Sequence, residues 1–168
     1  KTLEGLENCR KHKIITGAAT SVCQSNYELV SEDWLKKLIS LGVHYAWFHT
    51  YRVVGPDAAP ELALTPEQVL NIRRFVVKMR SKLPLAIVDA YWDDKGQALC
   101  PMATGVSHHI SPYGDIEPCP IIQFATESIH DHDSIFEAMT QSSFLKDFRE
   151  SSAQVTRGCV VLERRDLV

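Results

Sequence analysis

Long hydrophobic runs, a strong charge of one sign and closely spaced cysteines are all missing from this sequence. No apolar run approaches the roughly 20 residues that a membrane-spanning helix needs, which argues against a membrane protein. The net charge is only −3 over 168 residues, so neither nucleic acid nor an anionic membrane surface is expected as a partner. The five cysteines, at positions 9, 23, 100, 119 and 159, are odd in number and widely and irregularly spaced, which fits a secreted disulfide framework poorly. We therefore expect a cytoplasmic protein, in which cysteine clusters more often mean metal or redox chemistry.

Common catalytic motifs are missing as well. The sequence has no phosphate-binding glycine loop, no nucleophile elbow and no helical H-E-x-x-H. Its composition, 45% apolar and 23% charged residues, is that of a globular chain with a buried core. The chain begins at Lys1, inside the helical pattern TLEGLENCRKH and without an initiator methionine. We expect a fragment of a longer protein.

Helix and strand patterns alternate in the first half of the chain. Ser31, followed by two acidic residues, is a helix start, and Thr65 to Gln68 form a capping box with proline at the first helical position. The alternation predicts βαβ units on a parallel sheet. The β-branched run at 13–23 is typical of a strand buried on both faces. Helical patterns cover residues 2–11 and those after Ser31 and Thr65, and strand patterns cover 13–23, 43–55 and 84–92.

The pattern changes after Gly96. Residues 111–115, SPYGD, are a turn signal that predicts an antiparallel hairpin. Short helical patterns follow around 135–139 and 144–148. We place a domain boundary at residue 94, so that residues 1–94 form part of an α/β sheet and residues 95–168 form a small module that contains cysteines.

Cys100, Cys119 and Cys159 all lie in this second module, each beside a turn residue. They are either small buried packing residues or ligands. The module has few large aliphatic residues, so a bound ion or cluster would add stability that it otherwise lacks. The hairpin offers a way to bring Cys100 and Cys119 together. Thiolates favour zinc or iron–sulfur clusters, and composition does not choose between the two.

Histidines are further candidates in this module. His108 and His109 are adjacent on a predicted strand, where neighbouring side chains point to opposite faces. At most one of them can therefore face a metal held by the cysteines, and His109 is carried as a metal candidate. His130 and His132 lie in a polar segment that precedes a helix, and we expect no metal there.

A second set of candidates lies in the α/β part. Parallel α/β sheets bind ligands at the carboxyl ends of their strands. Asn26 follows the first predicted strand, and His49 and Arg52 lie at the end of the second. We carry all three as cofactor-binding candidates. Cys9 and Cys23 are interpreted as packing residues.

The cysteine-bearing hairpin also resembles a known family. Its spacing is C-x13-G-x4-C, with Gly114 as the glycine. This resembles the opening of the SPASM and twitch modules, which follow the barrel of many radical S-adenosylmethionine enzymes and bind auxiliary iron–sulfur clusters. In that family the hairpin typically has the form I-S-P-x-G-x-I-x-P-C-P, and a distant cysteine completes the set, as Cys159 in TRGC would here. The matching hairpin residues are Ile110, Ser111, Pro112, Gly114, Ile116, Pro118, Cys119 and Pro120.

The upstream half is similar to the same family. TSVCQSN resembles the end of the fifth strand of its partial (β/α)6 TIM-like barrel, and GVHYAWFHTYRVVGPD with LALTPEQV resembles the sixth strand and the next helix. The family's C-x3-C-x2-C motif, which holds the cluster that cleaves S-adenosylmethionine, is absent from this sequence. Only three cysteines match the module, which implies a single cluster, as in twitch modules. Its fourth iron would be held by a non-cysteine residue, by a residue outside the fragment or by substrate.

The resemblance implies the C-terminal part of a radical S-adenosylmethionine oxidoreductase or maturase, inactive by itself. Cys100, Cys119 and Cys159 would bind an auxiliary [4Fe–4S] cluster for electron transfer or substrate anchoring, and the full-length parent would bind S-adenosylmethionine. Substrates in the wider family are often peptides or proteins. The alternative is a structural zinc-binding or plain interaction module without catalysis.

Overall fold

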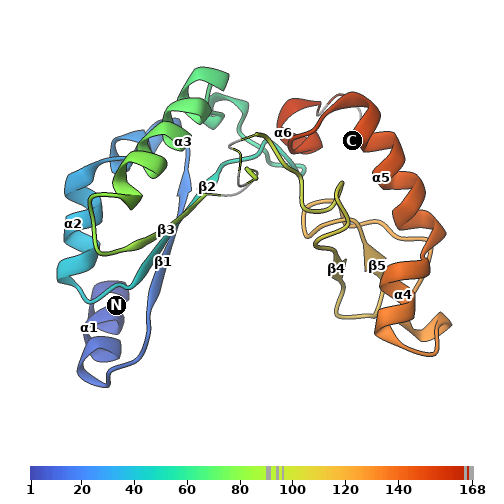
Figure 1. Ribbon diagram of the computed structural model, residues 1–168, viewed down its shortest axis with the longest axis horizontal. Coiled ribbons are helices and arrows are strands. Elements are labelled where there is room, and N and C mark those ends of the chain that lie inside the picture. Colours follow the sequence, from blue (N-terminus) through green and yellow to red (C-terminus); the bar gives the residue numbers. More distant parts are fainter. Residues whose placement is uncertain (90–91, 94, 96, 165, 167–168) are drawn as a thin grey trace. The chain divides into compact units, whose positions relative to one another are not determined.

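The computed structural model describes residues 1–89, 92–93, 95, 97–164 and 166. The chain divides into two compact units, Lys1–Ala90 and Tyr91–Val168 (Figure 1). The predicted boundary at residue 94 lies outside the described residues. We call the two parts unit 1 and unit 2 and describe each by itself.

Unit 1 is built on a parallel three-stranded sheet, so the predicted α/β alternation is confirmed. Its strands lie in the order β1-β2-β3, and Gly17 of β1 is in register with Tyr45 of β2. Strands β1 and β2 are shorter than the predicted ranges 13–23 and 43–55, and β3 begins two residues later than predicted. In chain order the elements are α1 (Thr2–Lys11), β1 (Gly17–Val22), η1 (Gln24–Leu29), α2 (Glu32–Ser40), β2 (Tyr45–Thr50), η2 (Pro60–Leu62), α3 (Pro66–Arg80) and β3 (Ala86–Asp89).

The predicted helix starts are confirmed by their caps. The Ser31 hydroxyl accepts a hydrogen bond from the backbone N–H of Trp34, 3.3 Å away, at the first turn of α2. Thr65 and Gln68 form a reciprocal capping box at the start of α3: each side chain accepts from the backbone N–H of the other residue, at 3.2 Å and 2.8 Å. These bonds satisfy N–H groups that have no partner within the helix.

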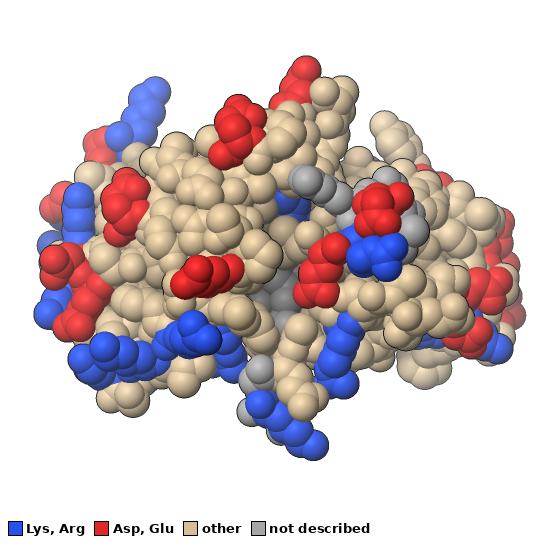
Figure 2. Space-filling model, turned by 90° about the horizontal axis from the view of Figure 1, so that it is seen from above, with Lys and Arg blue, Asp and Glu red and all other residues tan. Residues whose placement is uncertain are grey.

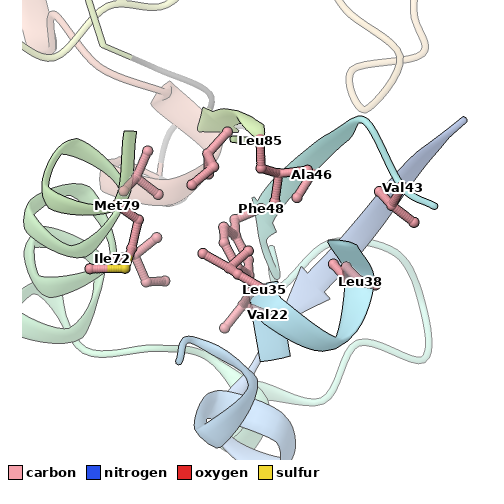
Figure 3. Packing of buried hydrophobic residues seen from close by; sticks show 11 residues of the cluster. Val22, Leu35, Leu38, Val43, Ala46, Phe48, Ile72, Met79 and Leu85 are labelled. Atoms are coloured by element: carbon pink, nitrogen blue, oxygen red, sulfur yellow. The ribbon is translucent and has the colours of Figure 1, made fainter. Parts of the chain in front are cut away.

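The core of unit 1 lies between the sheet and its helices (Figure 3). Helices α1, α2 and α3 lie on the same side of the sheet (Figure 1). Strand residues alternate between buried and more exposed positions, with Ala46 and Phe48 buried on β2. The buried cluster is Val22, Leu35, Leu38, Val43, Ala46, Phe48, Ile72, Val76, Met79, Leu85 and Ile87.

The expectation that the 13–23 strand is buried on both faces is wrong. Ala19 and Ser21 of β1 are exposed, whereas Thr20 and Val22 are buried. The reason is that the helices described in unit 1 pack on one face of the sheet. Small, weakly polar residues at 17–22 fit a strand with either one or two covered faces, so the sequence pattern did not distinguish them.

Unit 2 contains the predicted antiparallel hairpin. Strand β4 (His109–Ile110) pairs with β5 (Ile116–Glu117), with His109 opposite Glu117. The turn between them needs a glycine, because Gly114 has a φ of +93°. Three α-helices and one 3₁₀ turn follow: η3 (Ile129–Asp131), α4 (Ile135–Gln141), α5 (Ser143–Val155) and α6 (Val160–Glu163). Helices α4 and α5 extend beyond the predicted ranges.

The surface carries charges of both signs. Figure 2 shows Lys and Arg interspersed with Asp and Glu over the face it presents, in keeping with the small net charge. Among the helices of the described residues, none has the length and apolar character needed to cross a membrane.

Candidate functional site

Three free cysteines of unit 2 gather in one neighbourhood. Cys119 and Cys159 belong to the same apolar cluster, in which Ile122, Val160 and Val161 are buried. Cys100 is attached to the Cys159 segment, because its backbone N–H donates a 3.0 Å hydrogen bond to the carbonyl of Arg157. Cys100 is 8% exposed and Cys159 is 7% exposed, so both thiols lie almost entirely out of water.

The route by which the cysteines meet differs from the expected one. The hairpin ladder joins residues 109–110 to 116–117, and Cys100 lies well before it, directly ahead of the turn at 101–105. The Arg157 side chain reinforces the link between the Cys100 and Cys159 segments: its Nε donates to the Ala98 carbonyl at 2.8 Å, and its Nη2 lies 2.7 Å from Asp93 Oδ2. The chain segments on either side of the hairpin, rather than its strands, therefore place Cys100.

The electrostatics of Cys100 reflect this neighbourhood. Burial raises the pKa of its thiol, and the nearby Cys159 and Cys119 sulfurs raise the pKa further. The backbone N–H groups of Ala103 and Met102 hydrogen-bond to the sulfur and act in the opposite direction, because they favour the thiolate. The sulfur is thus a protonated thiol at neutral pH whose backbone is already arranged to stabilise a bound thiolate.

The three sulfurs do not converge on a single point. Among the described residues, no group of three or more His, Cys, Asp or Glu side chains is arranged to hold a metal ion. A zinc site would need its sulfur ligands about 3.8 Å apart, given tetrahedral Zn–S bonds of about 2.3 Å. An iron–sulfur cluster needs a wider spacing of the cysteine sulfurs, because each cysteine binds a separate iron atom. Three thiols are chemically suitable ligands for an iron–sulfur cluster. Among the described residues of unit 2 there is no fourth cysteine.

The two adjacent histidines have different partners. His109 Nδ1 lies 2.6 Å from Oε2 of Glu117, its partner across the hairpin, and Glu117 is buried. His108 instead lies beside the backbone carbonyl of Pro118, and its Nδ1 is buried with no hydrogen-bond partner among the described residues. Burial, followed by the charge of Arg149, lowers the pKa of His108.

The three cofactor-binding candidates of unit 1, Asn26, His49 and Arg52, differ in their surroundings. Asn26 closes the turn after β1, because its side chain accepts from Cys23 N at 2.8 Å and donates to the Ser21 carbonyl at 2.9 Å. His49 lies near the carboxyl end of β2, where burial and then the charge of Arg52 lower its pKa. The structure therefore brings His49 and Arg52 together and engages Asn26 in its own turn.

His49 belongs to a sheet face that none of the described helices of unit 1 covers. Its ring stacks on Trp47, with centroids 4.5 Å apart, and Tyr45 lies two residues farther back on the same face. Tyr45 and Trp47 are 42% and 39% exposed. We did not single out these two aromatic residues from the sequence, although their period of two in YAWFHT was the available signal.

Comparison with solved structures finds chains of similar fold. No family model matches, and no curated protein matches. The chain superposes on SuiB of Streptococcus suis with a TM-score of 0.69 and 10% sequence identity, covering 95% of this chain and 45% of that chain. A second SuiB structure, bound to S-adenosylmethionine, matches with a TM-score of 0.68 and 11% identity, covering 95% of this chain and 44% of that one. At this identity the likeness establishes the fold, which is similar to somewhat less than half of SuiB.

Proposed function

We propose that this chain is the C-terminal part of a radical S-adenosylmethionine oxidoreductase or maturase, and that unit 2 binds one auxiliary [4Fe–4S] cluster through Cys100, Cys119 and Cys159. The observation that carries the proposal is the gathering of these three thiols around the hairpin motif. The hairpin resembles the SPASM and twitch pattern. The buried Cys159 and the partly buried Cys119 belong to one small apolar cluster, and the buried Cys100 lies nearby.

The residues around the thiols support a cluster. Backbone N–H groups of Met102 and Ala103 hydrogen-bond to the Cys100 sulfur, and hydrogen bonds to cluster sulfurs are a means by which proteins adjust cluster potentials. The buried apolar residues Ile122, Val160 and Val161 belong to the same cluster as Cys119 and Cys159. When bound, the cluster supplies electron transfer or, through an open iron, a point at which substrate can be anchored.

Unit 1 supports the barrel part of the proposal. Its uncovered face, with Trp47 and His49 on β2, is the face that would line the interior of a barrel whose helices lie outside. The likeness to SuiB, a protein crystallised with S-adenosylmethionine, fits this assignment. The cluster that cleaves S-adenosylmethionine would be supplied by the rest of the parent chain. A peptide or protein substrate is inferred from analogy at the level of the fold.

Anaerobic reconstitution of the chain with iron and sulfide tests the proposal. We expect a brown protein that contains iron and acid-labile sulfide. Alanine substitution of Cys100, Cys119 or Cys159 should greatly reduce both, whereas Cys9→Ala, in α1, should leave them unchanged. Circular dichroism of each variant verifies that it folds.

Other outcomes would replace the proposal. Stoichiometric zinc in a colourless protein that unfolds on chelation would identify a structural zinc module. No bound metal, together with only a modest loss of stability in Cys119→Ala, would identify a plain interaction module with buried thiols.

A further inference from the structure

Unit 2 has a surface pocket that the proposed cluster does not use. Its volume is about 360 Å³, at the small end of the range for ligand pockets, so it suits one side chain better than a whole cofactor. Most of its lining comes from α5, and none of the three cysteines lines it. The lining residues are Thr126, Ser143, Phe144, Asp147, Phe148 and Ser151.

Aromatic rings form one side of this pocket. Phe144 and Phe148, one helical turn apart on α5, have ring centroids 6.2 Å apart. Phe124, which is 51% exposed, meets both rings edge to face at 5.8 Å and 6.0 Å. Phe148 packs against the apolar cluster that contains Cys159, and Phe144 packs against a second buried cluster that contains Ile116. The rings are therefore held in place without a ligand.

A single carboxylate supplies the charge of the pocket. Asp147 is the charged member of the lining set, it is exposed, and it has no ion-pair or hydrogen-bond partner among the described residues. It lies on the same side of α5 as Phe144, three residues earlier. Lys146 is its neighbour in sequence, and adjacent helical residues do not face each other. Arg149 is directed elsewhere, because its Nη1 would lie 2.6 Å from a Cβ on Gly105.

A second carboxylate offsets the positive end of the helix beside the pocket. Glu127 Oε1 accepts hydrogen bonds from the Phe144 N–H at 3.1 Å and from the Ser143 hydroxyl at 2.9 Å. Burial opposes the ionisation of Glu127, but the hydrogen bonds outweigh it and the pKa is lowered. Its negative charge compensates the dipole at the N-terminus of α5. The pocket therefore combines negative charge with aromatic surface, and none of its lining residues is a cation.

We propose that this pocket binds an arginine side chain of a polypeptide partner. A guanidinium group pairs with a carboxylate through two parallel hydrogen bonds and stacks on aromatic rings, and the alkyl stem of arginine covers apolar surface. A free amino acid also needs a cation for its α-carboxylate, which none of the lining residues supplies. The inference goes beyond the proposed function and does not need the cluster. Phe148 joins the pocket to the apolar cluster of Cys159, so the partner lies close to the cysteines.

Nuclear magnetic resonance titration of the ¹⁵N-labelled chain tests the proposal. The first probe is N-acetyl-arginine N-methylamide, which represents an arginine within a peptide. The second is the same compound made from citrulline, which has a similar shape and no charge. We expect the arginine probe to shift the amide signals of residues 143–151 and to bind about fivefold more tightly than the citrulline probe, the advantage that a solvent-accessible ion pair provides.

A matched pair of variants locates the charge that is responsible. Asp147→Asn should remove the fivefold preference, whereas Glu150→Gln should keep it, because Glu150 is exposed on the same helix and does not line the pocket. A further measurement needs no variant. In 1 M NaCl the Debye length falls to about 3 Å, so the arginine probe should lose most of its advantage while the affinity of the citrulline probe stays the same.

The proposal has several ways to fail. Equal binding of the two probes, no binding of either, or an arginine preference that persists in Asp147→Asn would each overturn it. Free arginine that binds more tightly than the capped probe would overturn the assignment to a polypeptide. The titration uses the chain without added iron or sulfide, so these results leave the proposed cluster standing. A chain that binds no iron on reconstitution leaves the arginine pocket standing.

Discussion

Replacing Asp89 with alanine should destabilise unit 1 by breaking a buried ion pair at the end of β3. The Asp89 carboxylate is only 4% exposed and lies opposite the buried Phe48 in register, so it faces the helices. Arg73 Nη1 of α3 lies 2.9 Å from Asp89 Oδ1 and 3.3 Å from Oδ2. Arg80 Nη2 lies 3.0 Å from Oδ1, and its Nε donates to the Ile87 carbonyl.

The two arginines should not contribute equally. The Arg73 side chain is 15% exposed and that of Arg80 is 42% exposed. Breaking a buried pair by removing one partner costs about 3–5 kcal/mol, whereas an exposed pair contributes about 0–1 kcal/mol. We expect Asp89→Ala to lower the free energy of unfolding by about 3 kcal/mol, at the low end of that range because Arg73 keeps some contact with water.

Urea titration followed by tryptophan fluorescence measures this loss, because Trp34 and Trp47 both lie in unit 1. Asp57→Ala, at an exposed loop position, is the matched control and should change stability by less than about 0.5 kcal/mol. Double-mutant cycles with Arg73→Met and Arg80→Met separate the two contacts. A loss below about 1 kcal/mol, or a coupling to Arg80 as large as that to Arg73, would refute the reasoning.

Three further predictions concern a cap, a titration and a turn. Thr65→Ala removes the capping box with Gln68 and should cost about 1 kcal/mol in urea titration; an unchanged midpoint would contradict this. The pKa of His49 is lowered in the folded state, so its contribution is fully present above the unfolded value of about 6.5 and is lost as pH falls through the lower folded value. His49→Asn should therefore reduce the fall in urea midpoint between pH 7.5 and 5.5, and an identical fall would count against it. Gly114→Ala should destabilise unit 2 by about 1–2 kcal/mol, measured by thermal melting, because alanine is strained at the positive φ of this turn; an unaltered melting temperature would argue otherwise.

Local signals in the sequence predicted much of the fold. Ser31 and Thr65 mark helix starts because their side chains cap nearby N–H groups, and this depends on a few neighbouring residues only. Gly114 marks the hairpin turn because the turn needs a positive φ, which is also a local property of the chain. The uncovered face of the sheet could not be predicted from the 13–23 run, because burial depends on what packs against a strand and not only on its own residues.

The candidate site was predictable in composition and less so in arrangement. The spacing around Gly114 singled out Cys100 and Cys119, and the family resemblance added Cys159. The link from Cys100 to Arg157, however, joins residues far apart in sequence. The alternation of a strand shows that His108 and His109 face opposite ways. It does not show which one meets Glu117, because that depends on the register of the hairpin. The sequence analysis named His109 as the metal candidate, whereas in the structure His109 is paired with Glu117.

The central claim is that the three cysteines of unit 2 bind an iron–sulfur cluster. Mössbauer spectroscopy of the chain reconstituted with ⁵⁷Fe tests it most directly, because it reports the type of iron site as well as the amount of iron. The account predicts the quadrupole doublets of a diamagnetic [4Fe–4S] cluster, greatly reduced in Cys119→Ala and unchanged in Cys9→Ala. Mononuclear iron alone, or a cluster spectrum that is equally strong in Cys119→Ala, would contradict it.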